Sequence, residues 1–309
     1  MLPDTRYATA VDGVRIAYQV LGDGPYDLVY SSGWLSNVDV HLEVPDLGEF
    51  LRDLARRARL ITFDRRGTGV SDRPSAVETI SLEKGTDDLL AVMDAVGSER
   101  ALLFGFEDGC VPSLLFAASH PGRTLGLLLF APWVSFWSTP DFPWGWTEEE
   151  ADEWDEHVRT EWGTEAFARW NLEDAAPSTL RDPGRVRAWT RYWRLCASPD
   201  AVEALNRMQR EIDARAVLPA VRVPTLVMHR TGDLSEPVRA GRFVADRIPG
   251  GRFVELQGDD HPPFIGDTRP VLAELDRFAA SILDQEAEFE RVLATVLFPD
   301  VVGSTERAA

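Results

Sequence analysis

The sequence predicts an α/β fold in which helices cover both faces of a mainly parallel sheet. The first observation is that short apolar runs of strand length alternate with segments of helical apolar spacing between residues 14 and 283. The second is the composition: 44% of the 309 residues are hydrophobic and 27% are charged, which is enough apolar material for a sizeable core. Strands that alternate with helices form βαβ units, and these place helices on both faces of a parallel sheet.

The elements follow from local patterns, in chain order. Residues 14–20 and 26–31 are apolar runs separated by the turn residues Gly22–Pro25, so they are predicted as two strands. Residues 47–58 carry Leu47, Phe50 and Leu54 at helical spacing, with Pro45 at the start of the segment, and are predicted as a helix. The same criteria predict strands at 59–64, 101–106, 124–130, 225–229 and 252–256, and helices at 82–96, 110–119, 238–248 and 271–283.

Two segments depart from this alternation. Residues 133–213 hold nine of the ten tryptophans and no strand-like run, so they are predicted as a helical lid inserted into a core made of residues 1–132 and 214–285. The aromatic residues of this lid either pack its own small core or line a pocket for an apolar ligand. Residues 286–309 are predicted as a linker followed by the first strand of a further, truncated domain, with the strand at 292–298.

Charge and cysteine content exclude several functions. With 51 acidic and 32 basic residues the net charge is −19, so neither nucleic acid nor an anionic membrane is expected as a partner. Two cysteines make no disulfide framework, and no segment reads as a signal peptide or a membrane span, so a cytoplasmic protein is expected.

The candidate catalytic residues lie in turns that follow predicted strands. The segment Gly105–Gly109 lies between a strand and a helix and has the G-x-S-x-G context, with Glu107 in place of the serine. Asp233 follows a later strand, and His261 follows the next one. This order of elbow, acid and histidine resembles the α/β hydrolases over about residues 6–285, so we expect the α/β-hydrolase fold.

The resemblance also implies a role for each residue. Asp233 matches the acid of the catalytic triad and His261 its histidine, while Asp259, Asp260 and Asp267 are alternative acids. The backbone N–H groups of Trp34 and Asp108 match the oxyanion hole. Glu107 occupies the position of the nucleophile.

A carboxylate in this position changes the chemistry. Glu107 has no proton to give at neutral pH, and its place at a helix N-terminus favours the ionised form. Between Glu107 and Asp233, His261 is expected to stay protonated, which removes it as a general base and with it the serine mechanism.

A carboxylate can itself be a nucleophile, as in the related dehalogenases and epoxide hydrolases. Dehalogenases place a tryptophan directly after the nucleophile, where this chain has Asp108. Epoxide hydrolases use two lid tyrosines, whereas residues 133–213 contain one, Tyr192. An active hydrolase with Glu107 as nucleophile or as a base for water therefore remains as an alternative.

The segment 288–309 resembles the first strand of class III adenylate/guanylate cyclases. The resemblance implies that Asp300 binds a metal, Mg²⁺ or Mn²⁺, in an intact cyclase domain, and that the full protein forms a homodimer. No cofactor is expected for the hydrolase-like part.

Together these features favour a regulatory domain of a nucleotide cyclase that has lost ester hydrolysis and binds a small apolar or cationic ligand. The alternatives are the active hydrolase and a structural dimerisation platform with no ligand.

Overall fold

An eight-stranded sheet forms the centre of the computed structural model, which describes residues 3–73 and 82–305. The strand order is β1-β2-β4-β3-β5-β6-β7-β8. The β1–β2 and β2–β4 pairs are antiparallel and the five other pairs are parallel, which confirms the mainly parallel sheet. The strands are β1 (Arg6–Thr9), β2 (Arg15–Leu21), β3 (Asp27–Ser31), β4 (Arg59–Phe63), β5 (Ala101–Phe106), β6 (Thr124–Phe130), β7 (Thr225–Arg230) and β8 (Arg252–Leu256).

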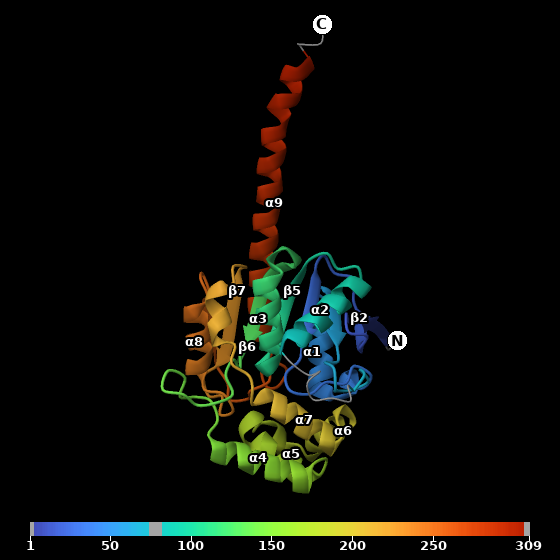
Figure 1. Cartoon of the computed structure of the whole chain (residues 1–309), viewed down its shortest axis with the longest axis vertical. Helices are drawn as coiled ribbons and strands as arrows, with labels where there is room; N and C mark the ends of the chain where they lie inside the picture. The colour runs from blue at the N-terminus through green and yellow to red at the C-terminus, as the bar shows by residue number, and fades with distance from the viewer. Residues whose placement is uncertain (1–2, 74–81, 306–309) are drawn as a thin grey trace.

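Helices cover both faces of this sheet, as Figure 1 shows. Alternate residues of a strand point to opposite faces, and in β5 Phe104 joins one apolar cluster while Leu103 joins another. The first cluster includes residues of α1 and α9, and the second includes residues of α2, α3 and α8. Their bounds are α1 (Pro45–Ala55), α2 (Leu82–Ala95), α3 (Cys110–Ser119), α8 (Val238–Arg247) and α9 (Arg269–Thr305).

Strand β1 is one element that the sequence pattern does not reveal. It has four residues, of which Ala8 alone is buried, so its apolar signal is weak. It exists because Arg6–Thr9 pairs in antiparallel register with β2, Arg6 opposite Tyr18. Such pairing is a tertiary contact, which local composition does not encode.

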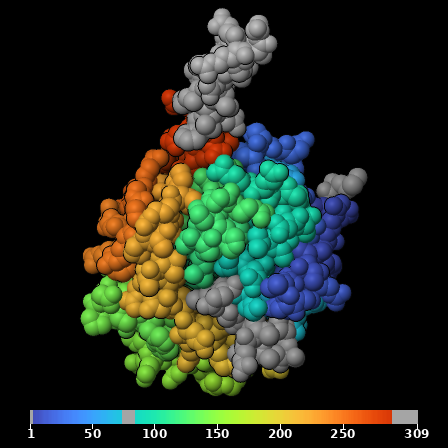
Figure 2. Space-filling model, turned by 45° about the horizontal axis from the view of Figure 1, so that its top comes forward, coloured from blue at the N-terminus to red at the C-terminus, as the bar shows by residue number. Residues whose placement is uncertain are grey.

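Between β6 and β7 the chain forms four helices at the end of the sheet where β5 and β6 finish, α4 (Glu148–Glu161), α5 (Glu165–Ala175), α6 (Pro183–Cys196) and α7 (Pro199–Gln209) (Figure 1). Helix α4 begins at a capping box in which Thr147 and Glu150 bond reciprocally. The rings of Trp154 and Trp162 lie 5.1 and 5.5 Å from that of Trp34, so the insertion packs on the loop after β3. In Figure 2 the insertion is packed directly against the rest of the molecule. The division into core and lid stays a prediction.

The strand expected at residues 292–298 is wrong, because these residues belong to helix α9. A strand needs a neighbouring strand for its backbone hydrogen bonds, whereas a helix satisfies them within its own segment. Helix α9 leads away from the sheet at the end opposite the insertion (Figure 1). Asp300 lies in the part of α9 whose side chains fall outside the described residues. In the described part of the chain no helix is both long and apolar enough to cross a membrane.

Candidate active site

The turn after β5 has the geometry of a nucleophile elbow. Phe106 ends the strand in extended conformation, residues Glu107–Gly109 form a 3₁₀ turn, and α3 follows directly. Glu107 has a φ of 54°, one of two positive values among the described residues other than glycine. This strained conformation lifts its side chain out of the line of the strand.

The two glycines of the elbow allow the chain to pack this tightly. A Cβ at Gly109 would lie 2.3 Å from the carbonyl oxygen of Ser32, and one at Gly105 would lie 2.7 Å from the Cα of Cys110. Both contacts are with backbone atoms, which cannot move aside easily. The strand–turn–helix predicted for Gly105–Gly109 is therefore present, with a carboxylate at its apex.

The carboxyl group of Glu107 points toward the loop after β3. A Cβ built on Gly33 would lie 2.3 Å from Oε2 of Glu107, so the carboxyl lies directly against this glycine. Gly33 precedes Trp34, whose N–H is one of the two predicted oxyanion-hole donors. The carboxyl of Glu107 thus lies beside the segment that carries one of the predicted oxyanion-hole donors.

Burial governs the charge of Glu107. Its pKa is raised to about 7, chiefly by desolvation and also by the Asp108 carboxylate, while His261 and Arg65 lower it. Burial thus opposes the ionised form of Glu107, which the helix N-terminus is expected to favour. Near neutral pH the group gains and loses a proton easily.

Asp233 and His261 form the hydrogen-bonded pair that the sequence predicts. Nδ1 of His261 lies 2.7 Å from Oδ2 of Asp233. The other oxygen of Asp233 accepts hydrogen bonds from the backbone N–H groups of Ser235 and Glu236, both at 3.0 Å. Asp233 is the acid in this pair, and the alternative acids are not bonded to the histidine.

Asp233 and His261 stabilise each other's charged forms. Burial raises the pKa of Asp233, but the charge of His261 and bonds from His229 and His261 lower it more, so its pKa lies well below its usual range. Burial also lowers the pKa of His261, but Asp233 and Glu107 outweigh it, so the net direction is upward. This direction agrees with a protonated histidine between two carboxylates.

Asp108, the residue after Glu107, connects the elbow to two other segments of the chain. Its Oδ2 lies 2.8 Å from Nη1 of Arg65 and accepts a hydrogen bond of 2.9 Å from Gln209 of α7. Arg65 also donates to the carbonyl oxygen of Trp34 at 3.1 Å. Arg65 therefore contacts both segments that carry the predicted oxyanion-hole groups, the elbow and the loop after β3.

The loop that carries His261 is held by β7 and by the insertion. Arg230, buried in β7, donates to the carbonyl oxygens of Asp260 and Pro262 at 2.5 and 2.8 Å. The N–H of His261 donates to the carbonyl oxygen of Ala175, the last residue of α5, at 2.7 Å. The ring of His261 lies 5.1 Å from that of Phe106. Arg65 and Arg230 were missed by sequence reasoning, because no motif marks them and only the fold brings them to the site.

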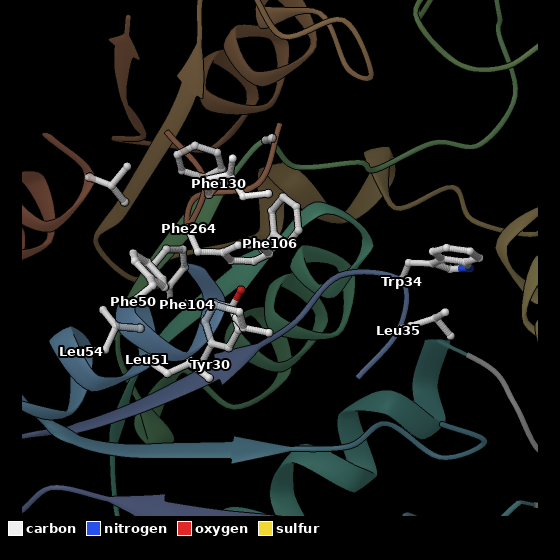
Figure 3. Packing of buried hydrophobic residues seen from close by; sticks show 14 of the residues in the cluster. Tyr30, Trp34, Leu35, Phe50, Leu51, Leu54, Phe104, Phe106, Phe130 and Phe264 are labelled. Carbon is white, nitrogen blue, oxygen red and sulfur yellow. The ribbon is translucent and has the colours of Figure 1, made fainter. Parts of the chain in front are cut away.

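A cavity of about 510 Å³ opens beside these groups, and Glu107 and His261 line it. Thirteen of its 39 lining residues are Phe, Trp or Tyr, and Figure 3 shows Trp34, Phe106 and Phe264 among them. Helix α4 contributes the carboxylates of Glu150 and Glu153 to the lining. Within the described ranges no group of three or more histidine, cysteine or acidic residues could hold a metal ion.

Known proteins resemble this chain over most of its length. A family model for the alpha/beta hydrolase fold matches residues 28–268. The AB hydrolase superfamily protein YisY of Bacillus subtilis is 26% identical over 75% of this chain and 85% of its own. The pimeloyl-[acyl-carrier protein] methyl ester esterase of Nitrosomonas europaea is 26% identical over 81% of this chain and 94% of its own. The crystal structure of the esterase RhEst1 from Rhodococcus sp. ECU1013 superposes with a TM-score of 0.76 at 26% identity, covering 90% of this chain and 99% of that one.

These likenesses overturn the cyclase hypothesis. The interpretation as a regulatory domain of a nucleotide cyclase, with hydrolysis lost, is wrong, because similar proteins of known activity are ester hydrolases. The hypothesis rested on the resemblance of residues 288–309 to a cyclase strand and on the replacement of the nucleophile by Glu107, and residues 292–298 are helical.

Proposed function

Because the chain belongs to the alpha/beta hydrolase family, whose model matches residues 28–268, we propose that it is an active hydrolase that cleaves a small carboxylic ester. Glu107 is its catalytic base. The observation that carries the proposal is the place of this carboxyl: at the apex of the elbow, with positive φ, lining the cavity together with His261.

Glu107 acts on water in this proposal. A carboxylate that attacks an ester carbonyl would form an anhydride, which is more reactive than the ester it came from. A carboxylate that removes a proton from water avoids this intermediate, and a base works best when its pKa lies near the working pH. Burial brings the pKa of Glu107 to about 7, close to that optimum.

The neighbouring groups support this role. The imidazolium of His261, held by Asp233, places a positive charge beside the site where negative charge develops on the substrate oxygen. The N–H groups of Trp34 and Asp108 are proposed as the oxyanion-hole donors, and Arg65 fixes both segments. The reaction needs water and no further cofactor.

The cavity favours a substrate that is apolar or cationic. Aromatic side chains bind apolar groups, and the faces of their rings also attract cations, while the carboxylates of Glu150 and Glu153 repel anions. Helices α4–α7 are proposed as a lid that closes this cavity. Both cysteines are free and buried, which supports an origin in a reducing compartment such as the cytoplasm.

Release of p-nitrophenol from p-nitrophenyl butyrate tests the proposal. Wild type should turn over, and Glu107→Gln should lower kcat by about 100-fold or more. Glu49→Gln, which removes an exposed carboxylate of α1 outside the cavity, should change it little. A silent wild type, or a Glu107→Gln variant as fast as wild type, would overturn the proposal.

Labelled water can reveal covalent attack by Glu107. After turnover in H₂¹⁸O, water activation leaves the peptide that contains Glu107 unlabelled; label in the acid product is no guide, because water that opens an anhydride at the substrate's acyl carbon gives the same product. Label in the side chain of Glu107 would show covalent attack by the carboxylate instead.

A further inference from the structure

A second carboxyl group, that of Glu236, lines the same cavity. Glu236 lies in the loop between β7 and α8, three residues after Asp233, and is 3% exposed. Its N–H donates to Asp233, and its carbonyl oxygen lies 2.7 Å from Nε2 of His229, within hydrogen-bond distance. Asp233 and His229 therefore hold the backbone of Glu236 in place, one at its N–H group and the other at its carbonyl oxygen.

The side chain of Glu236, in contrast, has no partner. Its Oε1 is buried without a hydrogen bond, and no described residue bonds to the carboxyl group. A buried carboxyl group without a partner is costly, and more so when it is charged. Its position on the cavity wall indicates that the missing partner is the bound molecule.

The surroundings of this carboxyl group favour its neutral form. Burial raises its pKa well above the usual range, and the nearby carboxylates of Asp233 and Glu107 raise it further. A neutral carboxyl group carries a proton that it can donate, whereas Glu107 can give up its own proton near neutral pH. The cavity thus holds a carboxyl base and a carboxyl acid.

We propose that Glu236 is the general acid of the reaction, which protonates the leaving-group oxygen of the substrate. This inference rests on the hydrolase function proposed above. His261 is less suited to the task, because giving up a proton would remove the positive charge that compensates Asp233 and Glu107.

The proton balance closes over one cycle. Glu107 takes a proton from water, and the resulting hydroxide adds to the carbonyl carbon. When the bond between that carbon and the leaving oxygen breaks, the proton of Glu236 moves to the leaving oxygen and an alcohol departs. The proton held by Glu107 then returns to Glu236, directly or through a water, and both carboxyl groups regain their starting states.

Two esters with the same acyl group test this role. Ethyl butyrate needs a proton on its departing oxygen, whereas p-nitrophenyl butyrate releases an anion that is stable without one. Glu236→Gln should lower kcat/KM by about 100-fold for ethyl butyrate and by less than about 3-fold for p-nitrophenyl butyrate. Glu236→Asp, which keeps an acid, should recover part of the ethyl ester activity. Glu49→Gln, which changes an exposed carboxylate of α1 outside the cavity, is the matched control.

The outcomes separate the two proposals. Equal losses on both esters, or no loss on either, would overturn the role of Glu236 while the hydrolase function stands. A wild type inactive on both esters would refute the hydrolase function itself. If Glu236→Gln melts far below wild type, the ratio of the two activities in Glu236→Asp decides, because a structural defect lowers both alike.

Discussion

Replacing Glu107 with glutamine should stabilise the protein at alkaline pH and do so much less in acid. The pKa of this carboxyl group rises from its ordinary 4.5 to about 7 in the folded state. The folded state therefore binds the proton more tightly than the unfolded state. Each tenfold change in proton affinity corresponds to about 1.4 kcal/mol, so ionising Glu107 costs the folded protein about 3 kcal/mol more than the unfolded chain.

The sign follows from the two pKa values. Below about pH 4.5 the group is protonated in both the folded and the unfolded state, so it does not lower the free energy of unfolding. As the pH rises toward 7 the penalty grows, and above about pH 7 it is fully present. Glutamine has the same shape and no charge, so it removes the penalty.

Urea denaturation at pH 5 and pH 8 measures this effect. The free energy of unfolding of Glu107→Gln should exceed that of wild type by about 3 kcal/mol at pH 8 and by much less at pH 5. For a chain of 309 residues this is roughly 5 °C in Tm. Glu153→Gln should show no such pH dependence. A difference between Glu107→Gln and wild type that is the same at both pH values would refute the reasoning.

Three further predictions concern the same molecule. The kcat/KM of wild type should rise as the pH passes about 7, because Glu107 then loses its proton. Asp108→Asn removes a neighbouring negative charge and should move this rise to lower pH. A rise at the same pH in both proteins would contradict the effect of Asp108 on the pKa of Glu107. Gly109→Ala should lower the free energy of unfolding by roughly 3 kcal/mol, because the new Cβ meets the carbonyl of Ser32; unchanged chemical denaturation would show that the elbow can relax. Phe50→Ala should cost about 3–5 kcal/mol in the same measurement, because Phe50 is buried in the first apolar cluster, and a loss below 1 kcal/mol would contradict that packing.

Most of the sheet could be predicted because its strands carry strong local signals. The run at β5 is wholly buried, and its apolar residues are consecutive, so both its place and its covered faces follow from the sequence. Strand β1 could not be predicted, because pairing with β2 stabilises it and its own residues are mostly exposed. The segment at 292–298 was assigned by resemblance to a strand, but its backbone forms a helix.

The sequence predicts which residues form the candidate site, but only in part how these residues ionise and act. Glu107, Asp233 and His261 follow strands in a recognisable order, and the fold brings them together. The ionisation of Glu107 depends on how completely water is excluded, which is a tertiary property. Glu236 escaped notice because nothing in its neighbourhood in the sequence distinguishes it from an ordinary surface glutamate.

The direction of helix α9 has a practical consequence. Its last described turns lie at the end of the molecule opposite the helices that cover the cavity (Figure 1). Cys110 and Cys196 are both buried, so a single cysteine introduced near the tip of this helix would react selectively with a maleimide-coated bead. A protein tethered in this way would present helices α4–α7, whose residues line the cavity, outward to the flowing solution.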